Sequence, residues 1–268
     1  MSVLAVIPAR LGATRLPRKP LRQLGGLPLV VRVYERVTSL EVADECVVAT
    51  DAVEIIDVCG RHGIPAVLTS SHHPSGTDRV AEVAARPEYA GYDVILNVQG
   101  DEPFVSGDAL AGAVAVVVRG RAPIGTAAVL ADAAILERPD VVKVVCDDFG
   151  NALYFSRAPI PFLRDITDAA ARVPHIRQHV GVYAYSRDAL AQWVAWPPHA
   201  LESIERLEQL RPLAHGLRIG VADVRAVEGG IDTEEDLARA NARWQQFVAS
   251  ATTSSQPTHH MTSRTGDA

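Results

Sequence analysis

The sequence has few aromatic residues and few cysteines, and it contains no long apolar run. Aromatic residues make up 5% of the 268 positions, so we expect an aliphatic core of Val, Ala and Leu. A chain of 268 residues can bury an ample core without disulfides, which excludes a small disulfide-stapled fold. Cys46, Cys59 and Cys146 are odd in number and far apart, which favours structural thiols. We find neither a secretory leader nor the about 20 apolar residues of a membrane span, and therefore expect a cytoplasmic protein.

Positive charge is also scarce. The chain has 26 Lys and Arg against 32 Asp and Glu, a formal net charge of -6. Proteins that coat nucleic acid rely on clustered Lys and Arg to release counterions from the phosphate backbone. This composition therefore disfavours a nucleic-acid-binding protein and fits a globular enzyme.

Two common nucleotide-binding fingerprints are missing after the first apolar run. Neither GxGxxG nor GxxxxGK[ST] occurs there. These glycine-rich turns hold phosphates in dinucleotide dehydrogenases and in P-loop NTPases, respectively. Both classes are therefore disfavoured.

What is present is an alternation of apolar runs with helical patterns. Such alternation implies right-handed crossovers and a doubly wound, mostly parallel α/β sheet. In a sheet of this kind the ligand site lies beyond the C-terminal ends of the strands. The predicted strands are residues 3–9, 46–49, 66–68 and 94–98, and the predicted helices between them are residues 29–37, 53–62 and 78–85.

The second half of the chain has a different pattern. Residues 141–146 and 152–156 flank a turn rich in Asp, Gly and Asn and predict a hairpin, part of a smaller antiparallel insertion over about residues 140–190. We expect a single α/β domain over residues 1–249. The Ser/Thr-rich residues 250–268 predict a disordered tail. Further predicted elements are strands at 179–185 and 218–224, and helices at 188–193, 202–210 and 233–248.

A basic loop follows the first predicted strand. Residues 7–21, IPARLGATRLPRKPL, contain four cations, two of which are Arg10 and Lys19. Pro17, Pro20 and Gly12 restrict the loop that carries these cations, so its charges and backbone N–H groups can face one anionic ligand such as a triphosphate. The alternative is a solvated basic loop.

Two acidic motifs are candidates for binding a hard cation. NVQGDEP, residues 97–103, places Asp101 at the end of an apolar run, and GGIDTEED, residues 229–236, places Asp232 before an acidic helix start. Magnesium uses one or two protein carboxylates and takes its other ligands from water and phosphates. The alternative for Asp101 is a helix cap, and the acids after Asp232 suit the helix dipole.

Two weaker groups of residues complete the set. PSGTDR, residues 74–79, could read the edge of a base, or it could simply cap a helix with Ser or Thr and place Arg on the helix surface. The other group suits an acidic sugar, since Arg and His suit its carboxylate and Glu and Gln its hydroxyls. Taken alone, however, ordinary core or surface hydrogen bonding is the favoured interpretation of these residues. This second group is Arg157, His179, Tyr183, Glu208 and Gln209.

Taken together and in this order, these stretches resemble the 3-deoxy-manno-octulosonate (Kdo) cytidylyltransferase family, the CMP-Kdo synthetases, over about residues 3–243. The resemblance is carried by the basic loop, VATD, HPSGTDR, NVQGDEP, ALYFSRAPIP, HVGVYAYSRDAL, WPPHALESIERLEQLR and GIDTEEDL. It implies a nucleotide-diphosphosugar-transferase type of fold, usually dimeric. It also implies transfer of CMP from CTP to Kdo, with release of pyrophosphate, for lipopolysaccharide biosynthesis.

The resemblance also implies roles for individual residues. Asp101 and Asp232 would hold Mg²⁺ and, with Lys19 and Arg10, would form the catalytic set. Around the nucleotide it places Arg10, Arg15, Lys19, Ser75, Gly76, Thr77, Arg79 and Gln99, and around the sugar Arg157, His179, Tyr183, Glu208 and Gln209.

Two alternatives to Kdo activation remain open at this point. One is a cytidylyltransferase for another acidic sugar, such as 8-amino-Kdo or a sialic acid. The other is a non-catalytic nucleotide-binding protein, which should lack one carboxylate of the metal pair. Both carboxylates are present, which disfavours the non-catalytic alternative.

One position departs from the family pattern. Arg18 stands where the family more often has glycine, between Pro17 and Lys19. Glycine adopts positive φ readily and arginine does not. Arg18 therefore predicts either that this position needs no positive φ or that the loop bends differently here.

Overall fold

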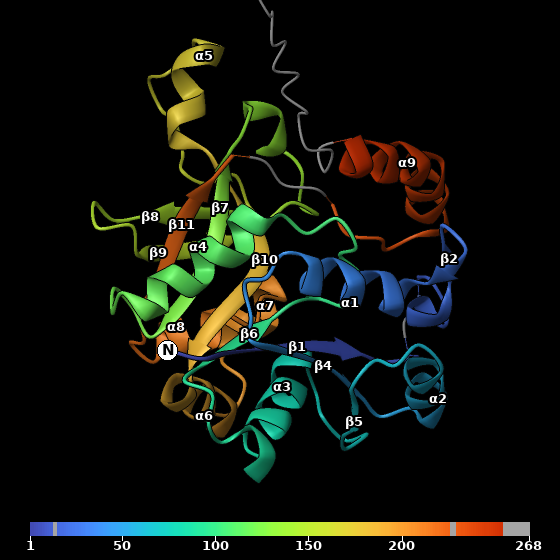
Figure 1. Ribbon diagram of the computed structural model, residues 1–268. Helices are drawn as coiled ribbons and strands as arrows, with labels where there is room; N and C mark the ends of the chain where they lie inside the picture. The colour runs from blue at the N-terminus through green and yellow to red at the C-terminus, as the bar shows by residue number, and fades with distance from the viewer. Residues whose placement is uncertain (13–14, 226–228, 254–268) are drawn as a thin grey trace, which may run out of the picture.

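The computed structural model describes residues 1–12, 15–225 and 229–253. Its centre is a nine-stranded sheet with the order β11-β7-β10-β6-β1-β4-β5, from which the β8–β9 hairpin branches at β10 (Figure 1). Every pairing along this order is parallel except the two made by β10, which is antiparallel to β6 and β7. The strands are β1 (Val3–Ala9), β4 (Glu45–Thr50), β5 (Ala66–Leu68), β6 (Val94–Asn97), β7 (Ile124–Leu130), β8 (Lys143–Cys146), β9 (Ala152–Ser156), β10 (Arg177–Ser186) and β11 (Ile219–Val224), with a separate pair β2 (Gln23–Leu24) and β3 (Leu27–Pro28).

Helices cover both faces of the sheet. Alternate residues of β1 belong to two separate apolar clusters, because successive side chains of a strand point to opposite faces. One cluster packs α1 (Leu29–Ser39), α2 (Val53–Arg61), α4 (Gly107–Val118) and α9 (Glu234–Thr253) onto the sheet. The other packs α3 (Gly76–Ala84), α6 (Arg187–Ala195) and α8 (Leu210–Ala214), and α5 (Ala169–Arg172) and α7 (Ala200–Glu205) are short helices outside these layers.

The doubly wound, mostly parallel α/β prediction is confirmed. The predicted strands at residues 3–9 and 66–68 have the observed bounds, and the hairpin of β8 and β9 turns at Gly150 with a φ of 75°. Strand β10 lies inside the predicted insertion, at residues 140–190, yet it is a central strand of the main sheet. Only the β8–β9 hairpin of this predicted insertion therefore lies outside the main strand order.

Two sequence predictions differ from the structure. The predicted helix at 202–210 is divided into α7 and α8, because Arg206 takes a left-handed conformation with a φ of 56°. Helix α9 continues to Thr253, four residues into the predicted tail, and residues 254–268 lie outside the described residues. Strand β7 was not predicted.

The three cysteines are free thiols. Cys46 and Cys59 are buried and Cys146 is half-buried. Burial raises the pKa of Cys46 to about 12 and the pKa values of Cys59 and Cys146 to about 11. These thiols are therefore protonated at neutral pH, which fits structural cysteines rather than nucleophiles. Among the described residues, no helix has the length and apolar character needed to cross a bilayer.

Candidate functional site

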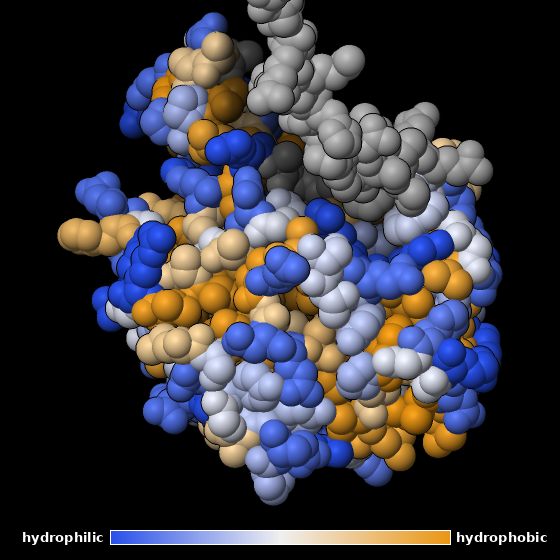
Figure 2. All heavy atoms as spheres, in the orientation of Figure 1, coloured by the Kyte–Doolittle hydropathy of each residue, from blue (hydrophilic) through white to orange (hydrophobic). Residues whose placement is uncertain are grey.

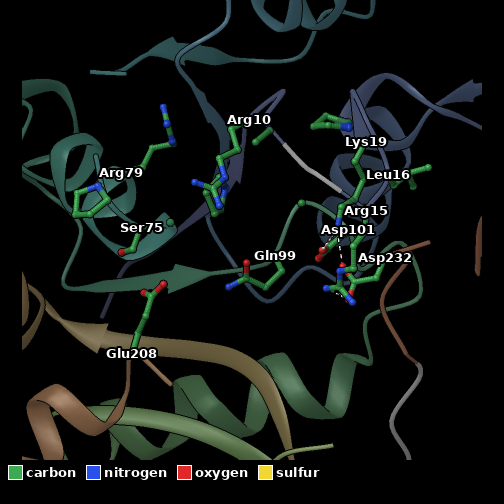
Figure 3. Close-up of a pocket in the computed structure, with 17 residues that line it drawn as sticks. Arg10, Arg15, Leu16, Lys19, Ser75, Arg79, Gln99, Asp101, Glu208 and Asp232 are labelled. Atoms are coloured by element: carbon green, nitrogen blue, oxygen red, sulfur yellow. Dashed lines mark hydrogen bonds and ion pairs between the residues drawn. The ribbon is translucent and has the colours of Figure 1, made fainter. Parts of the chain in front are cut away.

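A cavity of about 430 Å³ opens beyond the C-terminal ends of β1 and β6 (Figure 3). The chain leaves β1 toward β4 on one side, while β6 pairs with β1 on the other, so the cavity lies where the strand order reverses. Crevices of this kind are the usual ligand sites of doubly wound sheets. Predicted site residues on its lining are Arg10, Arg15, Lys19, Ser75, Gly76, Arg79, Gln99, Asp101, Glu208 and Asp232.

Gly100 lets the segment after β6 approach the end of β1. A Cβ atom at Gly100 would lie 2.6 Å from the backbone oxygen of Pro8, a separation that real Cβ atoms essentially never show. The absent side chain therefore allows Gln99 and Asp101 to face the same cavity as the basic loop after β1.

The two predicted metal carboxylates are brought together by a backbone contact. The N–H of Ile231 donates to the carbonyl oxygen of Asp101 at 2.9 Å, although the two residues belong to distant segments. The N–H of Asp232 in turn donates to Asp236 in the first turn of α9 at 3.1 Å. Asp101 and Asp232 thus lie side by side at the cavity wall (Figure 3).

Lys19 lies between these carboxylates. Its Nζ is 2.6 Å from Asp101 Oδ2 and 2.8 Å from Asp232 Oδ1, and Arg15 Nη2 lies 3.1 Å from Asp232 Oδ2. Burial lowers the pKa of Lys19, but the two carboxylates outweigh this effect and the net pKa shift is upward. Lys19 is therefore firmly protonated at neutral pH.

A third carboxyl group, Glu102, lies next to the pair. Burial, followed by the charges of Asp101 and Asp232, raises the pKa of Glu102 to about 8. Glu102 therefore carries a proton at neutral pH in the metal-free protein. Glu102 belongs to the NVQGDEP motif, and no role was predicted for it from the sequence.

Asp101 and Asp232 suit a magnesium ion. Both are ionisable oxygen donors that converge on one cation, the Lys19 ammonium, so their placement favours positive charge at that point. Within the described residues no group of three or more His, Cys, Asp or Glu could hold a metal by itself. Two carboxylates are nevertheless what Mg²⁺ commonly takes from a protein when phosphates supply further ligands.

The start of α3 forms the opposite side of the cavity. Ser75 is the N-cap residue and accepts the N–H of Asp78 at 3.3 Å, so the capping interpretation of this motif is confirmed. Arg79, however, is buried rather than on the helix surface. Its Nη2 lies 2.8 Å from Asp51 Oδ2, and its Nη1 donates a hydrogen bond to the Thr69 hydroxyl.

Asp51 is a residue that sequence analysis left without a role. It follows β4 directly, as Asp101 comes soon after β6, and acids just beyond parallel strands were the signal that could have identified it. The ion pair between Asp51 and Arg79 fixes the Arg79 guanidinium at the edge of the cavity.

Thr77 does not line the cavity. It is buried, and its hydroxyl donates to Glu208 Oε2 at 2.9 Å. Glu208 itself reaches the cavity from the segment between α7 and α8 (Figure 3). Among the five predicted sugar residues, Glu208 is therefore the one on the cavity lining, as far as the described part of the chain extends.

The other four predicted sugar residues are not part of this cavity lining. His179 and Tyr183 share a face of β10, as predicted, with ring centroids 5.5 Å apart. Burial lowers the pKa of His179 to about 3, so its ring is neutral at neutral pH and hydrogen bonds to Thr126 at 2.9 Å. Gln209 is buried.

Arg157 and Tyr183 differ in how their polar groups are satisfied. Arg157 donates to the carbonyl oxygens of Glu205 at 2.8 Å and Pro139 at 2.9 Å. The Tyr183 hydroxyl is buried and has no hydrogen-bond partner among the described residues. A buried unpaired hydroxyl is uncommon and marks a place where a ligand group can complete the hydrogen bonding.

The departure at Arg18 is resolved by the structure. Arg18 has φ 58° and ψ 32°, which is the left-handed conformation. The position takes a positive φ with arginine in place, so the alternative that it needs none is wrong. The other alternative, a different bend of the loop, stays a prediction. Its guanidinium contacts Glu54 at the surface.

Comparisons with known proteins identify the family of the chain. The family model described as Cytidylyltransferase matches residues 4–219. The 3-deoxy-manno-octulosonate cytidylyltransferase of Gemmatimonas aurantiaca is 71% identical over 249 residues, which cover 93% of this chain and 96% of that one. The enzyme of the same name from Polynucleobacter necessarius is 48% identical over 240 residues, covering 88% and 93%.

A solved structure shows the same fold. It is a CMP:2-keto-3-deoxy-manno-octonic acid synthetase complexed with CTP, with a TM-score of 0.85 and 35% sequence identity. The alignment covers 92% of this chain and 100% of that one. On the strength of these sequence and structural matches, the chain belongs to the 3-deoxy-manno-octulosonate cytidylyltransferase family.

Proposed function

We propose that the protein transfers CMP from CTP to 3-deoxy-manno-octulosonate, forming CMP-Kdo and pyrophosphate for lipopolysaccharide assembly. The observation that carries the proposal is the convergence of the basic loop with Asp101 and Asp232 on one cavity at the end of β1. Family membership supports both substrates. We also propose that the reaction takes place in the cytoplasm.

In the proposed reaction the anomeric hydroxyl of the sugar attacks the α-phosphorus of CTP, and pyrophosphate leaves. Arg10, Arg15 and Lys19 lie on the cavity wall and would neutralise the triphosphate and the departing pyrophosphate. Positioning of two anionic substrates is the main task of such a site, because each must approach the other against charge repulsion.

Asp101 and Asp232 would hold Mg²⁺. When bound, this ion supplies Lewis-acid stabilisation of phosphate charge. Lys19, which contacts both carboxylates here, would then turn its ammonium toward the phosphates. We leave the general base unassigned.

On the nucleotide side, Ser75, Gly76, Arg79 and Gln99 line the cavity and would surround the base and ribose. On the sugar side, Glu208 would accept hydrogen bonds from sugar hydroxyls. The unpaired Tyr183 hydroxyl supports the prediction that the β10 face also takes part. Neutral His179 can offer a hydrogen bond to the sugar but no positive charge. Arg157 and Gln209 remain predictions from the family.

We also propose that the protein is a homodimer. Three large apolar side chains within residues 140–190 are strongly exposed: Phe149 by 80%, Leu153 by 60% and Phe162 by 85%. Apolar surface is also visible at the projecting β8–β9 hairpin (Figure 2). Exposed apolar groups of this size favour association. Sedimentation equilibrium of the purified protein would test this, and a monomer at micromolar concentration would contradict it.

The substrate assignment is tested by measuring pyrophosphate release with magnesium, CTP and 3-deoxy-manno-octulosonate. Parallel reactions contain UTP in place of CTP, or sialic acid or the 8-amino sugar in place of the octulosonate. We expect release with the first pair. Faster release with another acidic sugar would move the sugar assignment, and no release with any pair would favour a non-catalytic nucleotide-binding protein.

A further inference from the structure

Thr77 connects the nucleotide side of the cavity to its sugar side. It belongs to the first turn of α3, directly after Ser75 and Gly76, which line the cavity. The Thr77 side chain points away from that lining, is 6% exposed and donates its hydroxyl hydrogen to Glu208 Oε2 at 2.9 Å. The start of α3 therefore places Ser75 and Gly76 on the nucleotide side of the cavity and connects Thr77 to Glu208 on the sugar side.

Glu208 has little regular structure to hold it. It lies between α7 and α8, after Arg206 has ended α7 in a left-handed conformation. The two helices that flank the segment are joined by an ion pair. The guanidinium of Arg211 on α8 donates to both carboxylate oxygens of Glu202 on α7, at 2.8 and 2.6 Å. The direction of the Glu208 carboxylate must therefore be set by its own side-chain contacts, which are hydrogen bonds with Thr77 and Ser75. The Thr77 bond has the larger effect on the Glu208 pKa.

Thr77 is itself firmly placed. It is buried together with Tyr185, and Asn97 Nδ2 lies 3.4 Å from the Tyr185 hydroxyl. Burial raises the pKa of Tyr185, and hydrogen bonds with Asn97 and Thr77 oppose that rise. A buried chain of polar groups thus runs from Asn97 on β6 through Tyr185 on β10 and Thr77 on α3 to Glu208.

We propose that Thr77 is a positioning residue for the sugar and not a nucleotide ligand. Its hydroxyl holds the Glu208 carboxylate toward the cavity, where the carboxylate accepts hydrogen bonds from sugar hydroxyls. The inference rests on the proposed function. It also gives a physical connection between the two substrates, because the turn that lines the nucleotide side continues into the residue that orients Glu208.

The test compares Thr77→Val, which keeps the shape and removes the hydroxyl, with Thr77→Ser, which keeps the hydroxyl. Steady-state pyrophosphate release gives KM for 3-deoxy-manno-octulosonate, and calorimetric titration without sugar gives the Kd of CTP. Loss of one hydrogen bond to a charged group predicts an increase of about 10-fold in the sugar KM of Thr77→Val. Its CTP Kd should stay within about twofold of wild type, and Thr77→Ser should restore the sugar KM.

A double-mutant cycle separates positioning from general damage. In a Glu208→Ala background, Thr77→Val should change the sugar KM by less than about twofold, because the carboxylate that it orients is gone. Circular dichroism melts establish that each variant folds, and Thr77→Ala carries the same prediction if Thr77→Val does not fold.

Three results would overturn the inference while leaving the proposed function intact. They are a wild-type sugar KM in Thr77→Val, a weakened CTP Kd with an unchanged sugar KM, and an additive double mutant. Absence of turnover by the wild-type protein would instead overturn the proposed function itself, and this inference with it.

Discussion

The Nζ atom of Lys19 lies 2.6 Å from Asp101 Oδ2 and is held there by a second contact, at 2.8 Å, with Asp232 Oδ1. The ammonium occupies the point on which the two carboxylates converge, where the proposed function places Mg²⁺. Two cations cannot share that point, because their repulsion at such short range is not screened by water. Metal binding must therefore displace Lys19.

Lys19→Met tests this exchange. Removing the ammonium leaves Asp101 without its ion pair and Asp232 paired with Arg15 alone, so we expect Mn²⁺, used as a paramagnetic probe in the absence of CTP, to bind more tightly than to wild type. Turnover should fall by about 100-fold or more, since Lys19 no longer stabilises the phosphates. Arg22→Met, which removes an exposed pair with Glu234, is the control. Weaker Mn²⁺ binding in Lys19→Met would contradict the account.

Arg18→Gly tests the strained position in the basic loop. Glycine removes the penalty of a left-handed residue, about 1 kcal/mol. Arg18→Ala removes the same contact with Glu54 but keeps the penalty, so the comparison isolates the backbone effect. We expect the free energy of unfolding, from urea titration, to be about 1 kcal/mol higher for the glycine variant than for the alanine variant. Equal stabilities would show that the loop does not hold this conformation in solution.

Gly100→Ala tests the close approach of the β6 segment to β1. The added Cβ would meet the Pro8 carbonyl at 2.6 Å, and backbone cannot move aside as a flexible side chain does. We expect kcat/KM to fall by about 100-fold, because Asp101 shifts with the segment. Gly12→Ala is a matched control on the same cavity, where a Cβ meets nothing within 4 Å. Equal activity of both variants would contradict the prediction.

The pH dependence of stability tests the buried state of His179. Its pKa is depressed from 6.5 to about 3 in the folded protein, so between these values the unfolded chain binds a proton that the folded protein does not. The stability contributed by the neutral ring is therefore present above pH 6.5 and is lost as the pH falls toward 3, by up to about 1.4 kcal/mol per pH unit.

His179→Gln should flatten this dependence, measured by urea unfolding at several pH values between 4.5 and 7, because glutamine does not titrate there. His62→Gln, at an exposed position, serves as control. An unchanged slope in His179→Gln would show that His179 is accessible to protons in the folded protein.

Much of the fold could be predicted because its signals are local. Strand β1 is an apolar run buried on both faces, and the pattern alone gave its bounds, Val3–Ala9. Strand β7 was missed because its sequence, IGTAAVL, is rich in small residues that strands usually avoid. The break between α7 and α8 was missed because Arg206, and not a glycine, takes the left-handed conformation.

The candidate site was predictable where residues follow strands and unpredictable where it depends on distant contacts. Lys19 and Asp101 lie beyond β1 and β6, so strand order alone brings them together. Thr77 was grouped with its sequence neighbours Ser75 and Gly76. The helical turn instead directs it to Glu208, 131 residues away, and no local pattern contains that contact.

The most direct test of the account is pyrophosphate release with magnesium, CTP and 3-deoxy-manno-octulosonate by the wild-type protein and by Asp101→Asn. The substitution keeps the size of the side chain and removes the charge that faces Lys19 and the proposed metal. We predict robust release by wild type and a loss of at least about 100-fold in the folded variant, even at saturating magnesium. Wild-type rates in Asp101→Asn would contradict the central claim that this carboxylate pair forms the reaction centre.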